Sequence, residues 1–331
     1  MILAGDVGGT KTVVALFDHS NGLRVLRDQT YPCADYPSLE AILDNFLRAR
    51  DAELLVGACF GVAGPVEHGV SKITNLPWTI DARVLSARLG GIPVNLMNDL
   101  QATALGSLVL PEDKFATLQP QAAAAPNGTI AVIAPGTGLG EATLVHDGER
   151  YRSLPSEGGH ADFAPGTDDE IELLRFLRKQ HGHHISYERV LSGDGIGDIY
   201  GFTRAQSGTP EPGWLAQQIA TGDRNAAVAK AALAGTDAAC VRALEMFAEI
   251  LGAEAGNIAL RSVATAGVVI GGGIPPKILP ALQAPRLLQR FNDKGRFAPW
   301  TRTLGVRVAL EPRAALLGAA HYVATSKDQR S

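Results

Sequence analysis

Short apolar runs that alternate with glycine-rich turns predict an α/β chain. Residues 2–4 and 13–17 are apolar and rich in β-forming side chains, and the glycine-rich stretch 5–12 separates them, which predicts a hairpin. The run 54–62 predicts a buried strand that ends in a second glycine-containing turn. Residues 94–97 predict a further strand, which ends at Asn98 and Asp99. Apolar side chains at helical spacing predict a helix over 38–50, with Ser38 as its N-cap.

The same order of elements recurs in the second half of the chain. Residues 119–128, rich in Ala, Pro and Gln, are interpreted as a connector between two units. Beyond them come an apolar strand at 129–134, a glycine turn at 135–140 and a strand at 142–145, which indicates a duplicated core. A strand at 267–270 then leads into three consecutive glycines. Helices are expected over 169–180, 238–261 and 313–323, and a last strand over 306–310.

Composition and charge narrow the classes of function. The 331 residues are 46% hydrophobic, which allows a large core and favours two units. The 30 Lys and Arg against 34 Asp and Glu give a net charge of −4 without a basic stretch, so nucleic-acid and anionic membrane partners are disfavoured. The three separated cysteines favour a reducing cytoplasm. The start of the chain does not resemble a signal peptide, and no apolar run reaches the roughly 18 residues of a membrane span.

Two familiar nucleotide-binding motifs do not match the glycine loops. A Walker A loop would require glycine where Thr10 stands, and a helix instead of a strand after Lys11. A dinucleotide fingerprint fails because neither loop combines the spacing with a following helix. What remains is a turn whose main-chain amides can approach phosphate oxygens and whose Asp6 can hold hydrated Mg²⁺. A tight hairpin that uses glycine for positive φ explains this segment alone equally well.

Eight short motifs, taken in order, resemble those of bacterial glucokinases, within the superfamily of sugar kinases, actin and heat-shock chaperone ATPases. The resemblance runs almost end to end. The motifs lie at residues 3–12, 61–65, 74–78, 98–102, 135–140, 156–160, 187–193 and 271–274. It implies a two-domain actin-like, ribonuclease H-like α/β fold with a sugar cleft, with a small domain of 1–110 plus 312–331 and a large domain of 111–311.

The resemblance also implies an activity and a set of binding residues. The activity is Mg-ATP-dependent phosphorylation of the 6-hydroxyl of glucose, which feeds glycolysis, by a cytoplasmic homodimer that uses ATP and Mg²⁺ and no zinc. The first two loops bind the phosphates of ATP and the third lies near the nucleoside. The residues implied for nucleotide binding are Asp6, which holds Mg²⁺ through water, and Gly8, Gly9, Thr10, Lys11, Gly136, Thr137, Gly138, Gly271, Gly272 and Gly273.

For the sugar, the resemblance assigns Asp99 as the general base that accepts the proton of the attacking hydroxyl. Asn98, Glu157, His160 and Glu188 are assigned to the sugar hydroxyls, since carboxylates, an amide and an imidazole suit groups that both donate and accept. Without the family, Asn98 and Asp99 would be interpreted as a turn or helix cap, Glu188 as a surface carboxylate and His160 as a structural histidine.

Several alternatives differ in substrate or class. Kinases of the same fold act on fructose, mannose or N-acetylmannosamine, or use polyphosphate, which should favour a basic groove that the composition lacks. A sugar-sensing repressor would need a DNA-binding extension before the first strand, and a chaperone-like ATPase would leave Glu157, His160 and Glu188 without a ligand. Zinc is not expected, because no cysteine lies near His160 and because His181, His183 and His184 lack zinc-site spacing. The apolar face of 238–261 suits either a dimer interface or the core.

Overall fold

The computed structural model describes residues 1–48, 51, 53–73, 76–123 and 125–326. Thr74 and Asn75 of the third motif, and the last two residues of the helix expected over 38–50, lie outside this range. The chain folds as two compact units. The first comprises residues 1–112, 146–155 and 311–331, and the second comprises 113–145 and 156–310. Residues 146–155 thus join the first unit although they lie within the range expected for the large domain, a grouping for which the sequence carried no signal.

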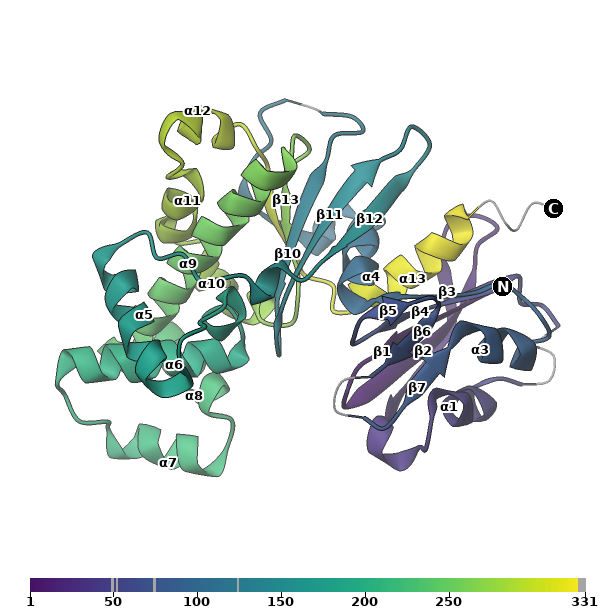
Figure 1. Cartoon of the computed structure of the whole chain (residues 1–331), viewed down its shortest axis with the longest axis horizontal. Coiled ribbons are helices and arrows are strands. Elements are labelled where there is room, and N and C mark those ends of the chain that lie inside the picture. The colour runs from purple at the N-terminus through teal and green to yellow at the C-terminus, as the bar shows by residue number, and fades with distance from the viewer. Residues whose placement is uncertain (49–50, 52, 74–75, 124, 327–331) are drawn as a thin grey trace. The chain divides into compact units, whose positions relative to one another are not determined.

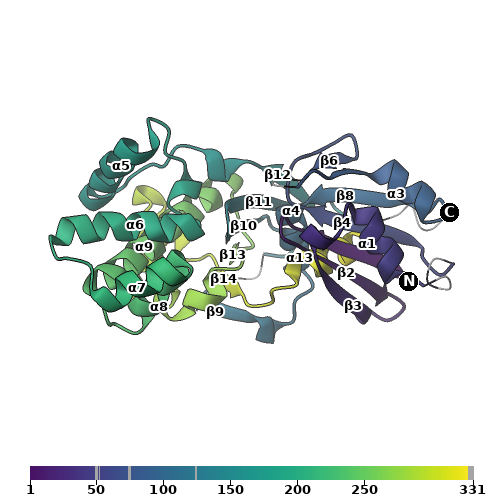
Figure 2. The ribbon, with the colours of Figure 1, turned by 90° about the horizontal axis from the view of Figure 1, so that it is seen from below.

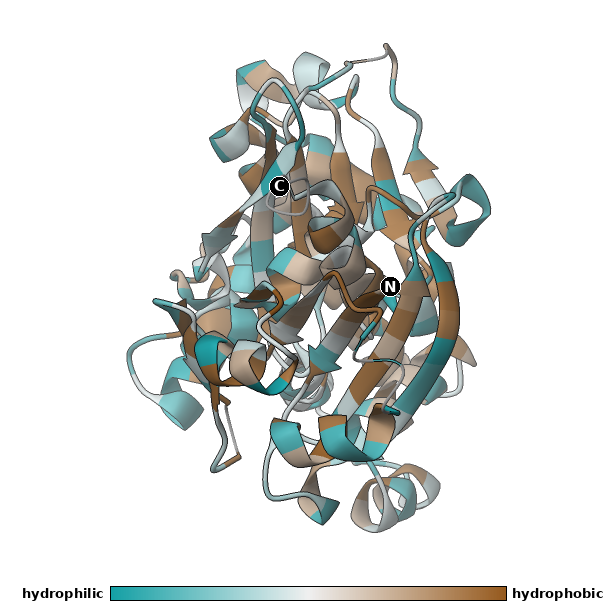
Figure 3. Cartoon of the chain, turned by 90° about the vertical axis from the view of Figure 1, so that its right-hand side faces the viewer, coloured by the Kyte–Doolittle hydropathy of each residue, from teal (hydrophilic) through white to brown (hydrophobic). Residues whose placement is uncertain are grey.

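The first unit contains a five-stranded sheet in the order β3-β2-β1-β4-β8. Its strands are β1 (Ile2–Val7), β2 (Lys11–Asp18), β3 (Arg24–Pro32), β4 (Gly57–Val62) and β8 (Val94–Asn98). Strand β1 pairs antiparallel with β2, as the hairpin pattern predicted, and parallel with β4. A small separate sheet consists of β5 (Val66–Glu67), β6 (Val70–Lys72) and β7 (Thr79–Asp81). Strands β1, β2 and β4 are mostly buried, whereas β3 is mostly exposed, and the strands drawn in Figure 3 carry both hydrophobic and hydrophilic stretches.

Helices cover this sheet (Figure 1). They are α1 (Leu39–Phe46), α3 (Ala82–Arg88), α4 (Asp99–Gly106) and α13 (Ala314–Thr325). Ser38 caps α1 by accepting a hydrogen bond from the N–H of Ala41, as predicted. Helices α4 and α13 lie backbone to backbone, because a Cβ placed on Gly318 would fall 1.8 Å from the carbonyl oxygen of Ala102. Glycine is therefore required where these two helices meet.

The second unit repeats the strand order of the first. The six-stranded sheet, of which this unit holds every strand but β12, has the order β12-β11-β10-β13-β14-β9, with β10 antiparallel to β11 and parallel to β13. The strands are β9 (Phe115–Gln119), β10 (Ile130–Pro135), β11 (Leu139–His146), β12 (Tyr151–Ser156), β13 (Val268–Ile270) and β14 (Val306–Ala309). β10, β11 and β13 thus correspond to β1, β2 and β4, which agrees with the duplicated core indicated by the sequence.

The segment interpreted as a connector does not join the two units. Gln119 is the last residue of β9, which pairs with β14 of the second unit, so residues 119–128 lie wholly within that unit. Residue 124 is outside the described range. The Ala-, Pro- and Gln-rich segment is the connection between two strands of one sheet, β9 and β10. Composition alone does not distinguish this from a linker between domains.

Helices form the other layer of the second unit (Figure 2). They are α5 (Asp168–His181), α6 (Gly193–Ser207), α7 (Gly213–Thr221), α8 (Arg224–Leu233), α9 (Ala238–Ser262), α10 (Leu279–Leu282), α11 (Pro285–Asn292) and α12 (Ala298–Thr301). Leu244, Phe247 and Leu251 of α9 are buried in the core of this unit. The apolar face of α9 therefore serves packing, which was one of its two predicted uses.

Candidate active site

The first glycine loop is a tight turn between two strands. β1 extends to Val7 and β2 begins at Lys11, so the turn is shorter than the stretch expected, and Asp6 lies within a strand. The N–H of Gly8 donates to the carbonyl of Lys11 at 3.0 Å, and the N–H of Cys33 donates to the carbonyl of Thr10 at 2.9 Å. Thr10 and Lys11 are exposed. A strand follows this loop, as the rejection of a Walker A motif required.

Asp6 lies in β1, opposite Val13 of β2 and Gly61 of β4. The pKa of Asp6 is raised to about 6, mainly by burial and then by the negative charge of Asp99, while the positive charge of Lys11 lowers it. The three predicted residues are therefore close enough to interact electrostatically. Two neighbouring carboxyl groups in partly buried surroundings offer the hard oxygen ligands that Mg²⁺ prefers, so these residues fit the ion that the family implies.

Asn98 and Asp99 lie at the junction of β8 and α4. The side-chain oxygen of Asn98 accepts a hydrogen bond from the N–H of Leu100 at 2.9 Å, and its Nδ2 donates to the carbonyl of Gly64 at 3.3 Å. Asn98 is thus the N-cap of α4, which was the alternative interpretation of this pair. Asp99 begins the helix, and its Oδ1 accepts from the N–H of Leu100 at 2.8 Å. The cap fixes the backbone from which Asp99 projects.

Gln101 belongs to this arrangement although the sequence analysis gave it no role. Its Oε1 accepts a hydrogen bond from the N–H of Asn98 at 3.2 Å, and its Nε2 donates to the carbonyl of Ser153 at 3.1 Å. This completes a capping box. An N-cap Asn followed three residues later by Gln is a sequence signature that could have identified it.

Glu157, His160 and Glu188 meet in the second unit. Nε2 of His160 lies 3.9 Å from Oε2 of Glu157, and Nδ1 of His160 lies 3.9 Å from Oε1 of Glu188. Glu157 immediately precedes the 3₁₀ turn Gly158–His160, which ends at His160, and Glu188 lies in the 3₁₀ turn Tyr187–Arg189. Their side chains are 73%, 62% and 34% exposed, respectively. Two carboxylates and an imidazole are therefore available to a polar ligand.

The two glycines between Glu157 and His160 allow close packing against β11. A Cβ on Gly159 would fall 2.2 Å from the carbonyl oxygen of Leu139, and one on Gly158 would fall 2.0 Å from Oε2 of Glu141. Larger residues at either position would push the segment away from the sheet. Close packing against β11 therefore explains why both positions are glycine.

The second glycine loop joins β10 to β11. The N–H of Gly136 donates to the carbonyl of Gly138 at 2.8 Å, and Thr137 between them is exposed. The N–H of Gly193, the first residue of α6, donates to the carbonyl of Gly136 at 2.9 Å. The positive end of α6 therefore lies at this loop, which favours an anion there. The sequence analysis predicted no helix at 193–207, although Ser192 at its N-cap is a recognisable signal.

The third glycine loop lies beside the second one. The N–H of Gly271 donates to the carbonyl of Ile133 at 2.8 Å, and the N–H of Ile274 donates to the carbonyl of Pro135 at 3.3 Å. Gly272 has a φ of +89°, and a Cβ there would fall 2.4 Å from the Pro135 oxygen. Both loops thus gather at the carboxyl end of β10, where ligands bind in α/β sheets.

Two of the three clustered histidines, His181 and His184, lie beside different carboxylates. Nε2 of His181 lies 2.7 Å from Oδ2 of Asp198, and Nδ1 of His184 lies 3.0 Å from Oδ1 of Asp162. Within the described part of the chain, no three His, Cys, Asp or Glu side chains form a group that could hold a metal ion by themselves. Cys33, Cys59 and Cys240 are buried free thiols.

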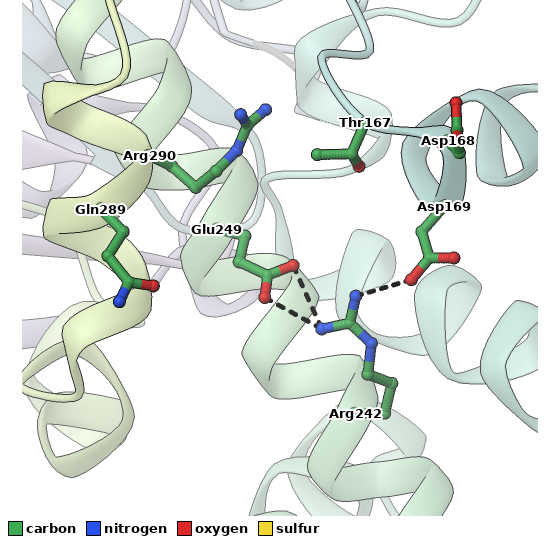
Figure 4. Close-up of a pocket in the computed structure, with 7 residues that line it drawn as sticks. All are labelled: Thr167, Asp168, Asp169, Arg242, Glu249, Gln289 and Arg290. Atoms are coloured by element: carbon green, nitrogen blue, oxygen red, sulfur yellow. Dashed lines mark hydrogen bonds and ion pairs between the residues drawn. The ribbon is translucent and has the colours of Figure 1, made fainter.

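A pocket of about 310 Å³ in the second unit contains none of the predicted site residues (Figure 4). Its charged side chains already neutralise one another. Arg242 donates to Glu249 at 3.0 Å and to Asp169 at 3.0 Å, and Arg290 pairs with Glu170 at 3.1 Å. Such a set of ion pairs stabilises the packing of α5, α9 and α11 and leaves little unsatisfied charge for a ligand. The helices described here include none that is both long and apolar enough to cross a bilayer.

The duplicated sheets, the paired glycine loops and the carboxylate at a strand end define a two-domain α/β sugar kinase of the actin-like type. The glucokinase family model matches residues 3–326. A glucokinase from Nostoc punctiforme is 39% identical over 337 residues, covering 97% of this chain and 98% of its own. This chain therefore belongs to the glucokinase family, ATP:D-glucose 6-phosphotransferases that convert glucose to glucose 6-phosphate.

Solved structures agree with this assignment. A glucokinase from an Antarctic psychrotroph superposes with a TM-score of 0.85 at 32% identity, covering 98% of this chain and 99% of its own. A glucokinase from Balamuthia mandrillaris in complex with glucose has a TM-score of 0.78 at 22% identity, covering 98% of this chain and 93% of its own, which shows the shared fold.

Proposed function

We propose that the residues described above carry out the glucokinase reaction in this chain. Asp99 acts as the general base. As the 6-oxygen of glucose forms its bond to the γ-phosphorus of ATP, the bond from that phosphorus to the bridging oxygen breaks, ADP leaves and the hydroxyl proton passes to the Asp99 carboxylate. The observation that carries this role is the placement of Asp99 at the carboxyl end of β8, on a backbone held by the Asn98 cap.

Glu157, His160 and Glu188, with Asn98, bind the sugar hydroxyls. The approach of Glu157 and Glu188 to within 3.9 Å of His160 supports this role. Hydrogen bonds to charged groups contribute about 1.5–3 kcal/mol each. A sugar with a misplaced hydroxyl leaves one of these groups unpaired, which is the physical basis proposed for the preference for glucose over other hexoses.

The glycine loops bind the nucleotide. Main-chain amides at Gly9 and Thr10, with Lys11, and those at Thr137 and Gly138 contact phosphate oxygens. Gly8 and Gly136, whose N–H groups close the two turns, let the backbone approach the phosphates, and Gly271, Gly272 and Gly273 lie near the nucleoside. Asp6 holds Mg²⁺ through its water shell, with Asp99 as the neighbouring carboxylate. Mg²⁺, when bound, neutralises charge on the phosphate oxygens. No zinc is required in this scheme.

Further parts of the proposal concern the state of the protein in the cell. We place it in the cytoplasm, which the three buried free thiols support.

A homodimer is proposed from the family resemblance, and the buried face of α9 is not available as its interface. The ranges 1–110 with 312–331 and 111–311 are proposed as the functional domains. Light scattering on the purified protein tests the dimer.

A coupled assay tests the substrate. Purified protein with Mg-ATP is supplied in turn with glucose, fructose, mannose and N-acetylmannosamine, and ADP release is followed. We expect kcat/KM to be highest for glucose. Preferential turnover of another sugar would overturn the preference, and turnover of none would overturn the proposal as a whole.

A further inference from the structure

A polar cluster with two buried carboxyl groups and an exposed arginine lies next to both segments that carry the proposed sugar ligands. It consists of Glu141 on β11, Glu254, Asn257 and Arg261 on α9, and the hydroxyl of Tyr187. Glu141 is 4% exposed and Glu254 is fully buried. Carboxyl groups are rarely buried this deeply, because burial of a charge costs free energy unless the charge is paired. The burial of Glu141 and Glu254 therefore suggests that they have a specific role.

On one side, the cluster contacts the segment that bears Glu157 and His160. Oε2 of Glu141 lies so close to Gly158 that a Cβ on that glycine would fall 2.0 Å from it. Gly158 is the residue immediately after Glu157 and begins the 3₁₀ turn that ends at His160. Any displacement of the Glu141 carboxyl group is therefore transmitted to this turn.

On the other side, the cluster contacts the segment that bears Glu188. Nδ2 of Asn257 donates to Oε2 of Glu254 at 2.9 Å and lies 3.2 Å from the hydroxyl oxygen of Tyr187, the residue before Glu188. Nζ of Lys294 donates to Oδ1 of Asn257 at 2.9 Å, which fixes the orientation of that amide. Glu254 is thus linked through Asn257 to the second sugar-binding turn.

Arg261 joins the two carboxyl groups. Its Nη2 forms an ion pair with Oε1 of Glu254 and lies 3.5 Å from Oε2 of Glu141. Oε1 of Glu141 finds no hydrogen-bond partner among the described residues. Burial, and then the negative charge of Glu254, raise the pKa of Glu141, while Arg261 opposes the rise. A proton on Glu141 leaves one carboxylate facing one guanidinium, and its loss adds a second negative charge beside Gly158.

We propose that Glu254, acting through Glu141 and Asn257, is a positioning residue for glucose binding that holds the Glu157–His160 turn and the Tyr187–Arg189 turn in mutual register. This proposal rests on the proposed sugar-binding roles of Glu157, His160 and Glu188. The three ligands come from segments about 30 residues apart in the chain, and α9 supplies a common rigid support for both. Small errors in such supports weaken ligand binding without removing any ligand.

Glu254→Gln tests the proposal, because it keeps the shape and removes the charge. We expect the KM for glucose to rise about tenfold, while the KM for ATP changes less than twofold, since Gly193 also holds the Gly136 loop. Glu249→Gln is the matched control. It lies on the same helix and loses a carboxylate paired with Arg242 and Arg286, away from the sugar residues, so the KM for glucose should not change.

Tyr187→Phe is a second variant that tests the positioning role if Glu254→Gln does not fold. It removes one hydroxyl and preserves the ring packing, and we expect the KM for glucose to rise about threefold. Glu141→Gln adds a pH signature. The KM for glucose should rise above neutral pH in the wild type and much less in this variant, because Gln cannot ionise. A merely structural cluster would lower Tm in these variants without moving the KM for glucose or its pH profile.

The outcomes separate this proposal from the proposed function. If His160→Ala raises the KM for glucose but Glu254→Gln and Tyr187→Phe do not, the positioning role is wrong and the sugar site stands. If the wild type phosphorylates glucose and His160→Ala leaves the KM unchanged, the assignment of the sugar site and the positioning role fail together. Absence of wild-type turnover overturns the proposed function itself.

Discussion

Glu188 connects the proposed sugar site to the second phosphate loop. Its Oε2 accepts a hydrogen bond from the N–H of Leu139 at 2.9 Å, immediately after the Gly136–Gly138 turn. Its Oε1 lies 3.9 Å from Nδ1 of His160. One carboxylate therefore contacts both the backbone of the loop proposed to bind ATP and the imidazole proposed to bind glucose. Its removal should affect both substrates.

Glu188→Ala is expected to raise the KM for glucose and also that for ATP, because the loop loses the acceptor for the N–H of Leu139. His160→Ala is the matched comparison and should raise the KM for glucose alone. A lost hydrogen bond involving a charged group costs about 1.5–3 kcal/mol, so increases of roughly 10- to 150-fold are expected for glucose. Steady-state kinetics with each substrate varied in turn measures both constants. An unchanged KM for ATP in Glu188→Ala would contradict the connection.

Gly138→Ala should disturb the contact between Glu188 and the second glycine loop, in this case by a change in the loop. A Cβ at this position would fall 2.4 Å from Oε2 of Glu188, so the carboxylate must move. We expect kcat/KM for both substrates to fall by at least tenfold, with little change in Tm. Gly213→Ala, where a Cβ meets no described atom within 4 Å, is the steric control and should behave as the wild type. Equal activity of the two variants would show that the Gly138 contact is unimportant.

Asp99→Asn should lower kcat by about 10²- to 10⁴-fold, which is the usual contribution of a general base. The fold should be retained, because an amide oxygen at this position can still accept a hydrogen bond from the N–H of Leu100. Asp81→Asn, at the N-cap of α3 in the same unit, controls for the loss of a carboxylate at a helix start. Rapid-quench measurement of glucose 6-phosphate formation gives kcat for each variant. A kcat of Asp99→Asn within threefold of the wild type would exclude Asp99 as the general base.

Asp6→Asn should have opposite effects on stability and activity. The pKa of Asp6 is raised from 3.8 to about 6 in the folded protein, so the folded state holds the proton more tightly than the unfolded chain does. The ionised Asp6 carboxylate therefore destabilises the folded state fully above pH 6, and this destabilisation disappears as the pH falls from about 6 towards 4. Without Mg²⁺, the variant should have a higher Tm than the wild type at pH 8, and this difference should shrink below pH 5.

Activity provides the second measurement on Asp6. The wild type should require more Mg²⁺ below pH 6, as protons compete for the carboxyl group, whereas Asp6→Asn should require high Mg²⁺ at every pH. A titration of Mg²⁺ at fixed ATP, at pH 5.5 and pH 8, gives this comparison. If the Mg²⁺ requirement of the variant follows that of the wild type at both pH values, Asp6 does not contribute to the Mg²⁺ site.

Local patterns in the sequence predicted much of the site's scaffold. The two glycine hairpins, the strand ending at Asn98 and the helix capped by Ser38 are all present, because alternation, glycine turns and caps act over a few residues. The helix over 193–207 was missed, since its glycines weaken the helical pattern. The interpretation of 119–128 as a connector between units was wrong, since a loop between two strands of one sheet can have the same Ala-, Pro- and Gln-rich composition as a linker.

The sequence by itself determined the residue types, their order and the short hairpins that present them. Only the tertiary structure decided which of them meet. The bond from Leu139 to Glu188 spans 49 residues, and the ion pair between Arg261 and Glu141 spans 120. No local pattern encodes such separations, because they arise when β10 pairs with β13 and α9 packs against the sheet. Short motifs therefore supply the functional groups of the candidate site, and long-range packing determines their geometry.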